Sequence, residues 1–212
     1  MGVLFIIATV AAILGSLVIT KPNLDDPDYL FKFSANKNRV LIGVLIELIA
    51  AGAVVGTGVM LFPVFKMHDE ALALAYFAGR SIEGVLIIGG AISALLLLSL
   101  SREYVAGASD ASHFQTLGTL LLAKRDWSLL VGPMIVFSIN ALILNYLFYQ
   151  SRLVPLFISV WGLIGAPLVL AAGLLVMFGR APLVSIIVIL LVLPIALNEM
   201  ILAVWLIVNG FH

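Results

Sequence analysis

The chain has 212 residues, of which 63% are hydrophobic and 10% charged, and eleven basic and eleven acidic residues give it a net charge of zero. A soluble domain contains about 45–50% apolar and about 25% charged residues, and a domain of this length has too little interior to bury so many apolar side chains. The composition therefore excludes a soluble enzyme, a nucleic-acid-binding protein and a disordered chain, and it predicts a polytopic protein in contact with the lipid bilayer.

Six apolar stretches are long enough, or nearly so, to cross the hydrocarbon core as helices, which takes about 20 residues each. Their apolar residues are continuous rather than alternating, so they predict helices and not the strands of a membrane barrel. We therefore expect an all-α helical bundle with six spans, forming a single transmembrane domain over residues 1–212. The predicted spans are residues 3–19, 40–62, 72–99, 127–149, 153–178 and 183–208.

The first stretch is expected to remain in the protein as a helix. No basic segment precedes it, and the apolar run ends at Thr20 without the small-residue cleavage site of a signal peptide. Cleavage is the alternative interpretation. The second stretch contains one acidic residue, Glu47, which lies about 10 Å inside its nearer surface at a rise of 1.5 Å per residue. We treat Glu47 as a secondary buried charge.

The third span carries the densest group of polar side chains. Arg80 and Glu83 are three residues apart and Tyr76 lies four residues before Arg80, so all three share one face of the helix. A charge near the bilayer centre costs about 2.5–3.5 kcal/mol on insertion scales, so buried ionisable residues are the first candidates for a functional site. We expect an Arg80–Glu83 pair with the Tyr76 hydroxyl as an additional partner.

The segment between the third and fourth spans, residues 100–126, has a pattern of its own. Ser109 or Asp110 is suited to cap a helix, and apolar residues then recur at helical spacing before Lys124 and Arg125. One interpretation is an interfacial amphipathic helix between the third and fourth spans. The other is a polar extension of the fourth span.

Polar residues of the fourth and sixth spans lie at depths that bring them near the group on the third span. Arg80 and Glu199 are both about 12–14 Å from the same surface at 1.5 Å per residue, so we expect them to pair between helices. Asn140 lies near the level of Glu83, and Asn145 is nearer the surface.

The sixth span is interrupted by a proline. Pro194 cannot donate a hydrogen bond to the carbonyl of Leu190, so we expect the helix to kink or open at this turn. Asn198 and Glu199 follow within about one turn, a combination that is typical of substrate and ion sites in transporters.

Lysine and arginine residues favour one orientation in the membrane. Eight of them lie in the first, third and fifth connections, against Lys66 and Arg152 in the second and fourth. The positive-inside rule then predicts that the first, third and fifth connections are cytoplasmic and that both termini are outside.

The residue patterns of familiar catalytic and cofactor sites are missing from the sequence. It has no cysteine, which excludes disulfides, thiolate metal sites and cysteine nucleophiles. No H-E-x-x-H, nucleophile elbow or P-loop occurs, and His68, His113 and His212 lie outside the spans without a spacing suited to zinc. We therefore predict no catalytic residue, no metal and no cofactor.

Several motifs resemble one bacterial membrane family. They are the stretch from Asn38 through Glu47 to Pro63, Ala73-Leu74-Ala75-Tyr76, Arg80-Ser81-Ile82-Glu83, Leu153-Val154-Pro155, Val160-Trp161-Gly162 and Pro194-Ile195-Ala196-Leu197-Asn198-Glu199. Together they look like the family named domain of unknown function 4386, and the resemblance covers nearly the whole chain. It implies a multi-pass protein of the prokaryotic cytoplasmic membrane and brings no catalytic residues with it.

Three functions are compatible with these patterns. The first is binding or transport of a small molecule or ion at a buried cluster. The second is a structural or accessory subunit, whose polar network fixes helix packing and the assembly with a protein partner. The third is an enzyme acting on lipid, with Glu83 or Glu199 as general acid or base. The predicted binding residues are Tyr76, Arg80, Glu83, Asn140, Asn145, Asn198 and Glu199.

Overall fold

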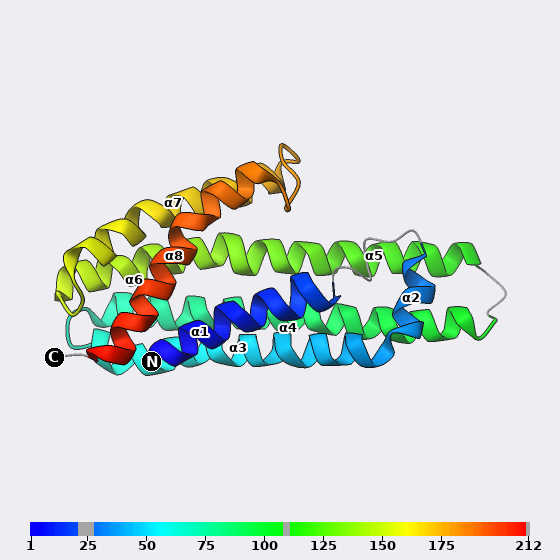
Figure 1. Ribbon diagram of the computed structural model, residues 1–212, viewed down its shortest axis with the longest axis horizontal. Coiled ribbons are helices and arrows are strands. Elements are labelled where there is room, and N and C mark those ends of the chain that lie inside the picture. The colour runs from blue at the N-terminus through cyan, green and yellow to red at the C-terminus, as the bar shows by residue number, and fades with distance from the viewer. Residues whose placement is uncertain (21–27, 108–110, 211–212) are drawn as a thin grey trace.

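The computed structural model describes residues 1–20, 28–107 and 111–210, and every element within these ranges is a helix (Figure 1). The all-α prediction is therefore confirmed for the described part of the chain. The elements in chain order are α1 (Gly2–Ala12), the π-helix η1 (Ile13–Thr20), α2 (Tyr29–Ala35), α3 (Lys37–Phe65), α4 (Glu70–Val105), α5 (Ala111–Leu130), the π-helix η3 (Val131–Val136), α6 (Phe137–Ser151), α7 (Leu156–Met177) and α8 (Ile186–Val208).

Five helices of the described ranges are long and apolar enough to cross a membrane. Four of them are α3, α4, α7 and α8, and the fifth is the continuous helix over Ser112–Ser151 that combines most of α5 with η3 and α6. The predicted first span corresponds to the shorter apolar helix α1 and the π-helical η1 that follows it. The described helices are therefore consistent with a helical membrane protein, as the composition predicts.

The ends of the helices follow from local polar and backbone signals. Asp69 precedes α4, and its side chain accepts a hydrogen bond of 2.9 Å from the backbone N–H of Leu72. Ser185 caps α8 in the same way through Val188. Such caps are worth about 1 kcal/mol each. Helix α6 ends at Ser151, and the following residue, Arg152, adopts the left-handed conformation with φ of 57°.

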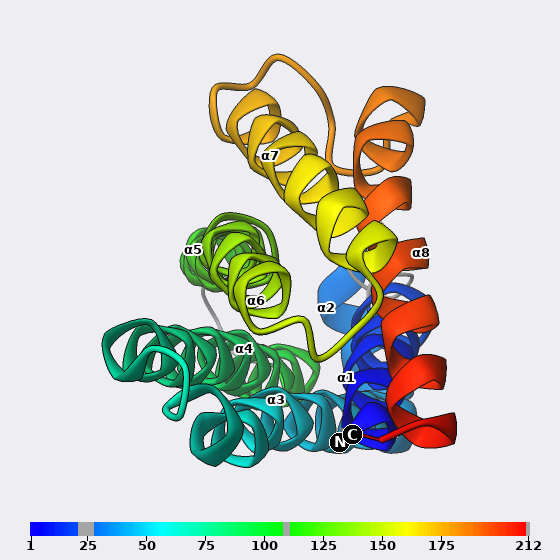
Figure 2. The ribbon, with the colours of Figure 1, turned by 90° about the vertical axis from the view of Figure 1, so that its left-hand side faces the viewer.

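The long helices α3, α4 and α5–α6 lie side by side and roughly parallel to the long axis of the molecule (Figure 1). Helix α1 packs on α3, and its first residues meet the end of α8, so the beginning of α1 and the end of α8 lie at the same end of the bundle (Figures 1 and 2). The hairpin of α7 and α8 is inclined to that axis, and its far end leans away from α1 (Figure 2). The largest buried apolar cluster lies where α1, α3, α4, α6, α7 and α8 converge.

The segment between the third and fourth predicted spans differs from a simple loop. Helix α4 continues to Val105, and α5 begins at Ala111 and runs directly into η3 and α6. Lys124 and Arg125, which the sequence analysis counted in a connection, therefore belong to a helix of the bundle, as the extension interpretation expects. The proposed caps Ser109 and Asp110 lie outside the described residues, as do Lys21 and His212.

The expected opening of the sixth span is absent from the secondary structure of α8, which stays helical on both sides of Pro194. The backbone is therefore not opened at Pro194, where Ile195 packs against Gly165 of α7, whereas the kink stays a prediction. Proline still removes the hydrogen bond to the carbonyl of Leu190.

Candidate functional site

The central polar cluster is built on α4. Tyr76, Arg80 and Glu83 lie on the buried face of this helix, with relative exposures of 0%, 3% and 3%. The Nε of Arg80 donates to the hydroxyl of Tyr76 over 3.0 Å, and its Nη1 donates to Oε2 of Glu83 over 2.9 Å. The i, i+3 and i, i+4 spacings thus produce the predicted contacts.

Glu199 reaches the same guanidinium from α8. Its Oε1 lies 3.5 Å from Nη2 of Arg80, so the pairing between the third and sixth predicted spans is confirmed. This pair is longer than the Arg80–Glu83 pair, and the Glu199 side chain is 12% exposed against 4% for that of Glu83. One arginine therefore joins α4 to α8, and Glu199 is the more accessible of its two acidic partners.

Aromatic rings surround the guanidinium. Its Cζ lies 5.5 Å from the ring centres of Tyr76 and Phe137 and 5.8 Å from that of Phe5. Cation–π contacts contribute about 0.5–2 kcal/mol each, with the larger values in desolvated surroundings. The rings come from α4, α6 and α1, so Arg80 is held by four helices once Glu199 is included.

Of the three predicted asparagines, Asn140 borders the cluster, whereas Asn145 and Asn198 donate to backbone carbonyls. Asn140 lies beside Glu83 and packs directly against Gly79. Asn145 donates through Nδ2 to the carbonyl of Ala141 over 2.8 Å. Asn198 donates through Nδ2 to the carbonyl of Ile158 over 2.7 Å, which ties α8 to α7.

Each of these amides is almost completely buried and keeps one polar atom unused. Within the described part of the chain, Nδ2 of Asn140 and Oδ1 of Asn145 and Asn198 have no hydrogen-bond partner. Of the predicted site residues, the structure thus brings together Tyr76, Arg80, Glu83 and Glu199, with Asn140 at the edge. Asn145 and Asn198 instead direct their hydrogen bonds to the backbone of α6 and α7.

A second buried ion pair involves a residue that the sequence analysis did not select. Arg125 of α5 donates through Nη1 to Oε2 of Glu47 over 3.1 Å, and its Nη2 contacts the other carboxylate oxygen. Nη1 also donates to the carbonyl of Gly90 on α4 over 2.9 Å. Arg125 is 2% exposed and Glu47 1%. The pair therefore joins α3, α4 and α5 inside the bundle.

The sequence contains a signal for this pair. An acidic side chain about 10 Å inside the membrane requires a compensating charge, and Arg125 precedes the predicted fourth span by two residues on the surface nearest Glu47. The pair was not predicted because Arg125 was assigned to a connection and not to a helix. The neighbouring Lys124 also turns toward α4, where its Nζ donates to the carbonyl of Gly89 and the hydroxyl of Ser93.

A largely apolar cavity lies beside the Glu47 carboxylate and extends to Phe137. Its volume is about 470 Å³, and its walls come from α1, η1, α3, α4, α5, η3, α6, α7, α8 and the connection before α8. Glu47 and Ser16 are its only polar lining residues within the described ranges. Phe137, which stacks on Arg80, also lines it, although Arg80 itself does not.

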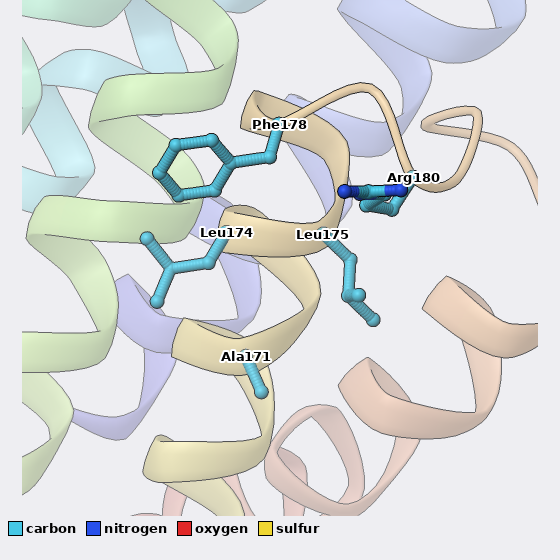
Figure 3. Close-up of a pocket in the computed structure, with 5 residues that line it drawn as sticks. All are labelled: Ala171, Leu174, Leu175, Phe178 and Arg180. Carbon is cyan, nitrogen blue, oxygen red and sulfur yellow. The ribbon is translucent and has the colours of Figure 1, made fainter.

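A second, more open hollow of about 570 Å³ lies along the end of α7 and the connection after it. Figure 3 shows its five lining side chains, Ala171, Leu174, Leu175, Phe178 and Arg180. The first four recur at helical spacing on an exposed stripe, and Arg180 is the only charged one. This arrangement is typical of a lipid-facing helix surface with a cation near its end.

Comparison with known proteins identifies the family but no described relative. The family model with the description Domain of unknown function (DUF4386) matches residues 1–210, and the chain belongs to this family. The resemblance seen in the sequence motifs is therefore confirmed. No curated protein and no solved structure matches the chain.

Proposed function

We propose that this member of the DUF4386 family is a six-span protein of the prokaryotic cytoplasmic membrane that binds a small cation, H⁺ or Na⁺, at the Arg80 cluster. Glu199 is the exchangeable ligand in this proposal. Transport of the bound ion or a coupled small molecule across the membrane is the wider form of the same hypothesis.

The observation that carries the proposal is the charge balance of the cluster. A single guanidinium faces two carboxylates, those of Glu83 and Glu199, so the three ionised side chains have a formal charge of −1. The second ion pair, Glu47 with Arg125, is balanced by itself and supplies no spare positive charge. An uncompensated charge is expensive inside a membrane, and a proton or cation at the cluster removes this cost.

Two features support Glu199 as the exchangeable group. It makes the longer contact to Arg80 and is the more exposed of the two carboxylates. Arg80 and Glu83, by contrast, form a short pair within one helix beneath aromatic rings. Pro194 lies about one turn before Glu199 in α8, where the missing hydrogen bond makes the backbone easier to distort.

The six-span topology rests on the first two elements. Together α1 and η1 cover Gly2–Thr20, which approaches the length of about 20 residues that a crossing needs. Helix α1 begins at the end of the bundle where α8 finishes (Figure 1), as six alternating crossings require. For the interfacial helix, the exposed Leu117 and Leu120 in the first half of α5 are apolar side chains suited to a membrane surface.

The test measures the thermal stability of the purified protein in detergent as a function of cation and pH. A cation that binds only the folded state raises the melting temperature with its concentration, so we expect Na⁺ at constant ionic strength, or a fall in pH, to stabilise the wild type. Glu199→Gln should lose this dependence, and Glu103→Gln, which changes an exposed carboxylate of α4, should keep it.

The outcomes distinguish Na⁺ from H⁺ and also test whether a cation binds at Glu199. Stabilisation by Na⁺ over choline at fixed pH identifies Na⁺, whereas stabilisation by lower pH alone identifies a proton. A wild-type response that persists unchanged in Glu199→Gln, or the lack of any response in the wild type, overturns the proposal.

The second candidate is a structural or accessory subunit, and the sealed position of Arg80 favours it. A cluster that ties four helices together under three aromatic rings is suited to fixing their arrangement. In that case Glu199→Gln changes the stability of the protein by a constant amount at every pH and Na⁺ concentration. Co-purification of a protein partner from a membrane extract would then be the supporting observation.

A further inference from the structure

The cavity of about 470 Å³ is bordered by two π-helices and by the part of α8 that contains a proline. Ile13 and Ser16 come from the π-helix η1, and Pro133 and Met134 come from the π-helix η3. On α8, the lining residues lie on both turns around Pro194. Stretches of π-helix are rare and occur frequently at functional sites, and here two of them and a proline turn border one cavity.

The cavity is partly open rather than fully enclosed, and α1, η1 and α8 contribute to its wall. Helices α1 and α8 touch where Gly2 meets Ala203, so closely that a side chain at Gly2 would collide with the α8 backbone. From this contact the two helices diverge along the bundle (Figures 1 and 2). The cavity is lined by η1 on one side of this wedge and by the first half of α8 on the other.

The lining offers no free polar group to a polar ligand. The Ser16 hydroxyl already donates to the carbonyl of Ala12 over 2.7 Å, and the Glu47 carboxylate is engaged by Arg125. The remaining lining residues are apolar. Because the surrounding helices are membrane-spanning, the medium at the wedge is hydrocarbon rather than water.

We propose that this cavity binds one acyl chain of a bilayer phospholipid, which enters between η1 and α8. An apolar cavity of about 150 Å³ already holds benzene, and ligand sites usually measure about 300–1,000 Å³, so the space suits a flexible chain. The polar end of the lipid lies toward Leu183 and Val184, where the exposed Arg180 is close in the chain and carries the charge that attracts a phosphate.

The experiment uses the full chain in lipid nanodiscs that contain a phospholipid with a photoactivatable diazirine on its acyl chain. After irradiation, mass spectrometry maps the labelled residues. We expect labelling of Met134 and Ile87, which line the inner wall of the cavity, in addition to the exposed residues that any surrounding lipid reaches.

Two variants fill the cavity from two different helices, Ala196→Phe on α8 and Val169→Phe on α7. The matched control is Leu197→Phe, which adds an aromatic ring at the adjacent, exposed position of α8. We expect each filling variant to lower labelling of Met134 and Ile87 by about tenfold, the effect of losing about 1.4 kcal/mol of binding free energy. The control should retain wild-type labelling.

Labelling confined to exposed residues in the wild type overturns the proposal, as does equal inner-wall labelling in all folded variants. Folding is checked by elution as a single species, and the use of two filling variants on different helices allows a conclusion from either one. The proposal does not depend on cation binding, so the labelling of Glu199→Gln is expected to match that of the wild type.

Discussion

Arginine side chains determine how the buried carboxylates of this protein are held. Arg80 shares its guanidinium between acidic residues of α4 and α8, whereas Arg125 gives two nitrogens to a single carboxylate, that of Glu47. The flat, forked guanidinium suits both arrangements, which the single ammonium of a lysine would not reproduce. The two arginines therefore produce one cluster with surplus negative charge and one that is neutral.

The Glu47–Arg125 pair allows a direct test of its structural role. Arg125→Ala removes the positive charge that faces the buried Glu47 carboxylate, so we expect the free energy of unfolding to fall by about 3–5 kcal/mol. The double change Glu47→Leu and Arg125→Met replaces the pair by apolar side chains and should recover most of this loss. Reversible unfolding in mixed micelles measures both values.

The control for this pair is Arg102→Ala, an exposed arginine near the end of α4 whose loss should change stability little. A double variant as unstable as Arg125→Ala would contradict the prediction, because it would show that the destabilisation does not come from the lost charge balance at Glu47.

Individual contacts of the cluster were predictable to the extent that helix geometry determines them. The spacing of Tyr76, Arg80 and Glu83 within one helix, and the shared depth of Arg80 and Glu199, led to contacts that the structure contains. The Glu47–Arg125 pair was missed because Arg125 was assigned to a connection, and because matching depth does not show that long side chains of α3 and α5 meet beside α4. Sequence periodicity gives the face of a helix but not its partner.

At the scale of the helices, the length of the apolar stretches predicted where helices occur but did not predict the π-helical segments within them. The second to sixth predicted spans each correspond to a helix, with ends displaced because polar turns extend α4 and α5 beyond the apolar core. The π-helices η1 and η3 have no counterpart in the prediction, since their apolar sequences, ILGSLVIT and VGPMIV, have no periodicity that distinguishes π from α geometry.

Close contact between α4 and α6 depends on a glycine. A Cβ at Gly79 would overlap the amide of Asn140, whose side chain is 1% exposed and has little room to move. We expect Gly79→Ala to lower the free energy of unfolding by about 1–3 kcal/mol through overpacking. The double variant Gly79→Ala with Asn140→Ser has a shorter side chain at position 140. It should therefore recover part of the lost free energy of unfolding, as measured by thermal unfolding.

Gly52 of α3 is the matched control for this substitution. Nothing lies within 4 Å of a Cβ at Gly52, so Gly52→Ala should be neutral or stabilise the helix by about 0.5–1 kcal/mol. Equal destabilisation by both alanines would show that the effect at Gly79 comes from the helix backbone rather than from contact with Asn140.

At the scale of the whole molecule, composition predicted the membrane environment but not the shape. The inclination of the α7–α8 hairpin and the wedge beside α1 (Figure 2) arise from contacts between distant segments, such as Gly2 with Ala203 and Gly165 with Ile195. Small residues occur in nearly every helix of this chain, so their presence alone does not reveal which pairs meet. The apolar cavity, which depends on that arrangement, is for this reason outside what the sequence could predict.

The orientation in the membrane is the last prediction, and the chain is well suited to its test. Because the sequence has no cysteine, each cysteine substitution introduces a single thiol. The excess of lysine and arginine at the end of the bundle that holds the first, third and fifth connections predicts that this end is cytoplasmic.

Met67→Cys, at the opposite end and 79% exposed, should react with a membrane-impermeant maleimide in intact cells. Glu103→Cys should react only after permeabilisation, and Val3→Cys, in the first turn of α1, should behave like Met67→Cys. Labelling of Glu103→Cys without Met67→Cys would reverse the orientation, and labelling of both in intact cells would contradict a bundle that crosses the membrane.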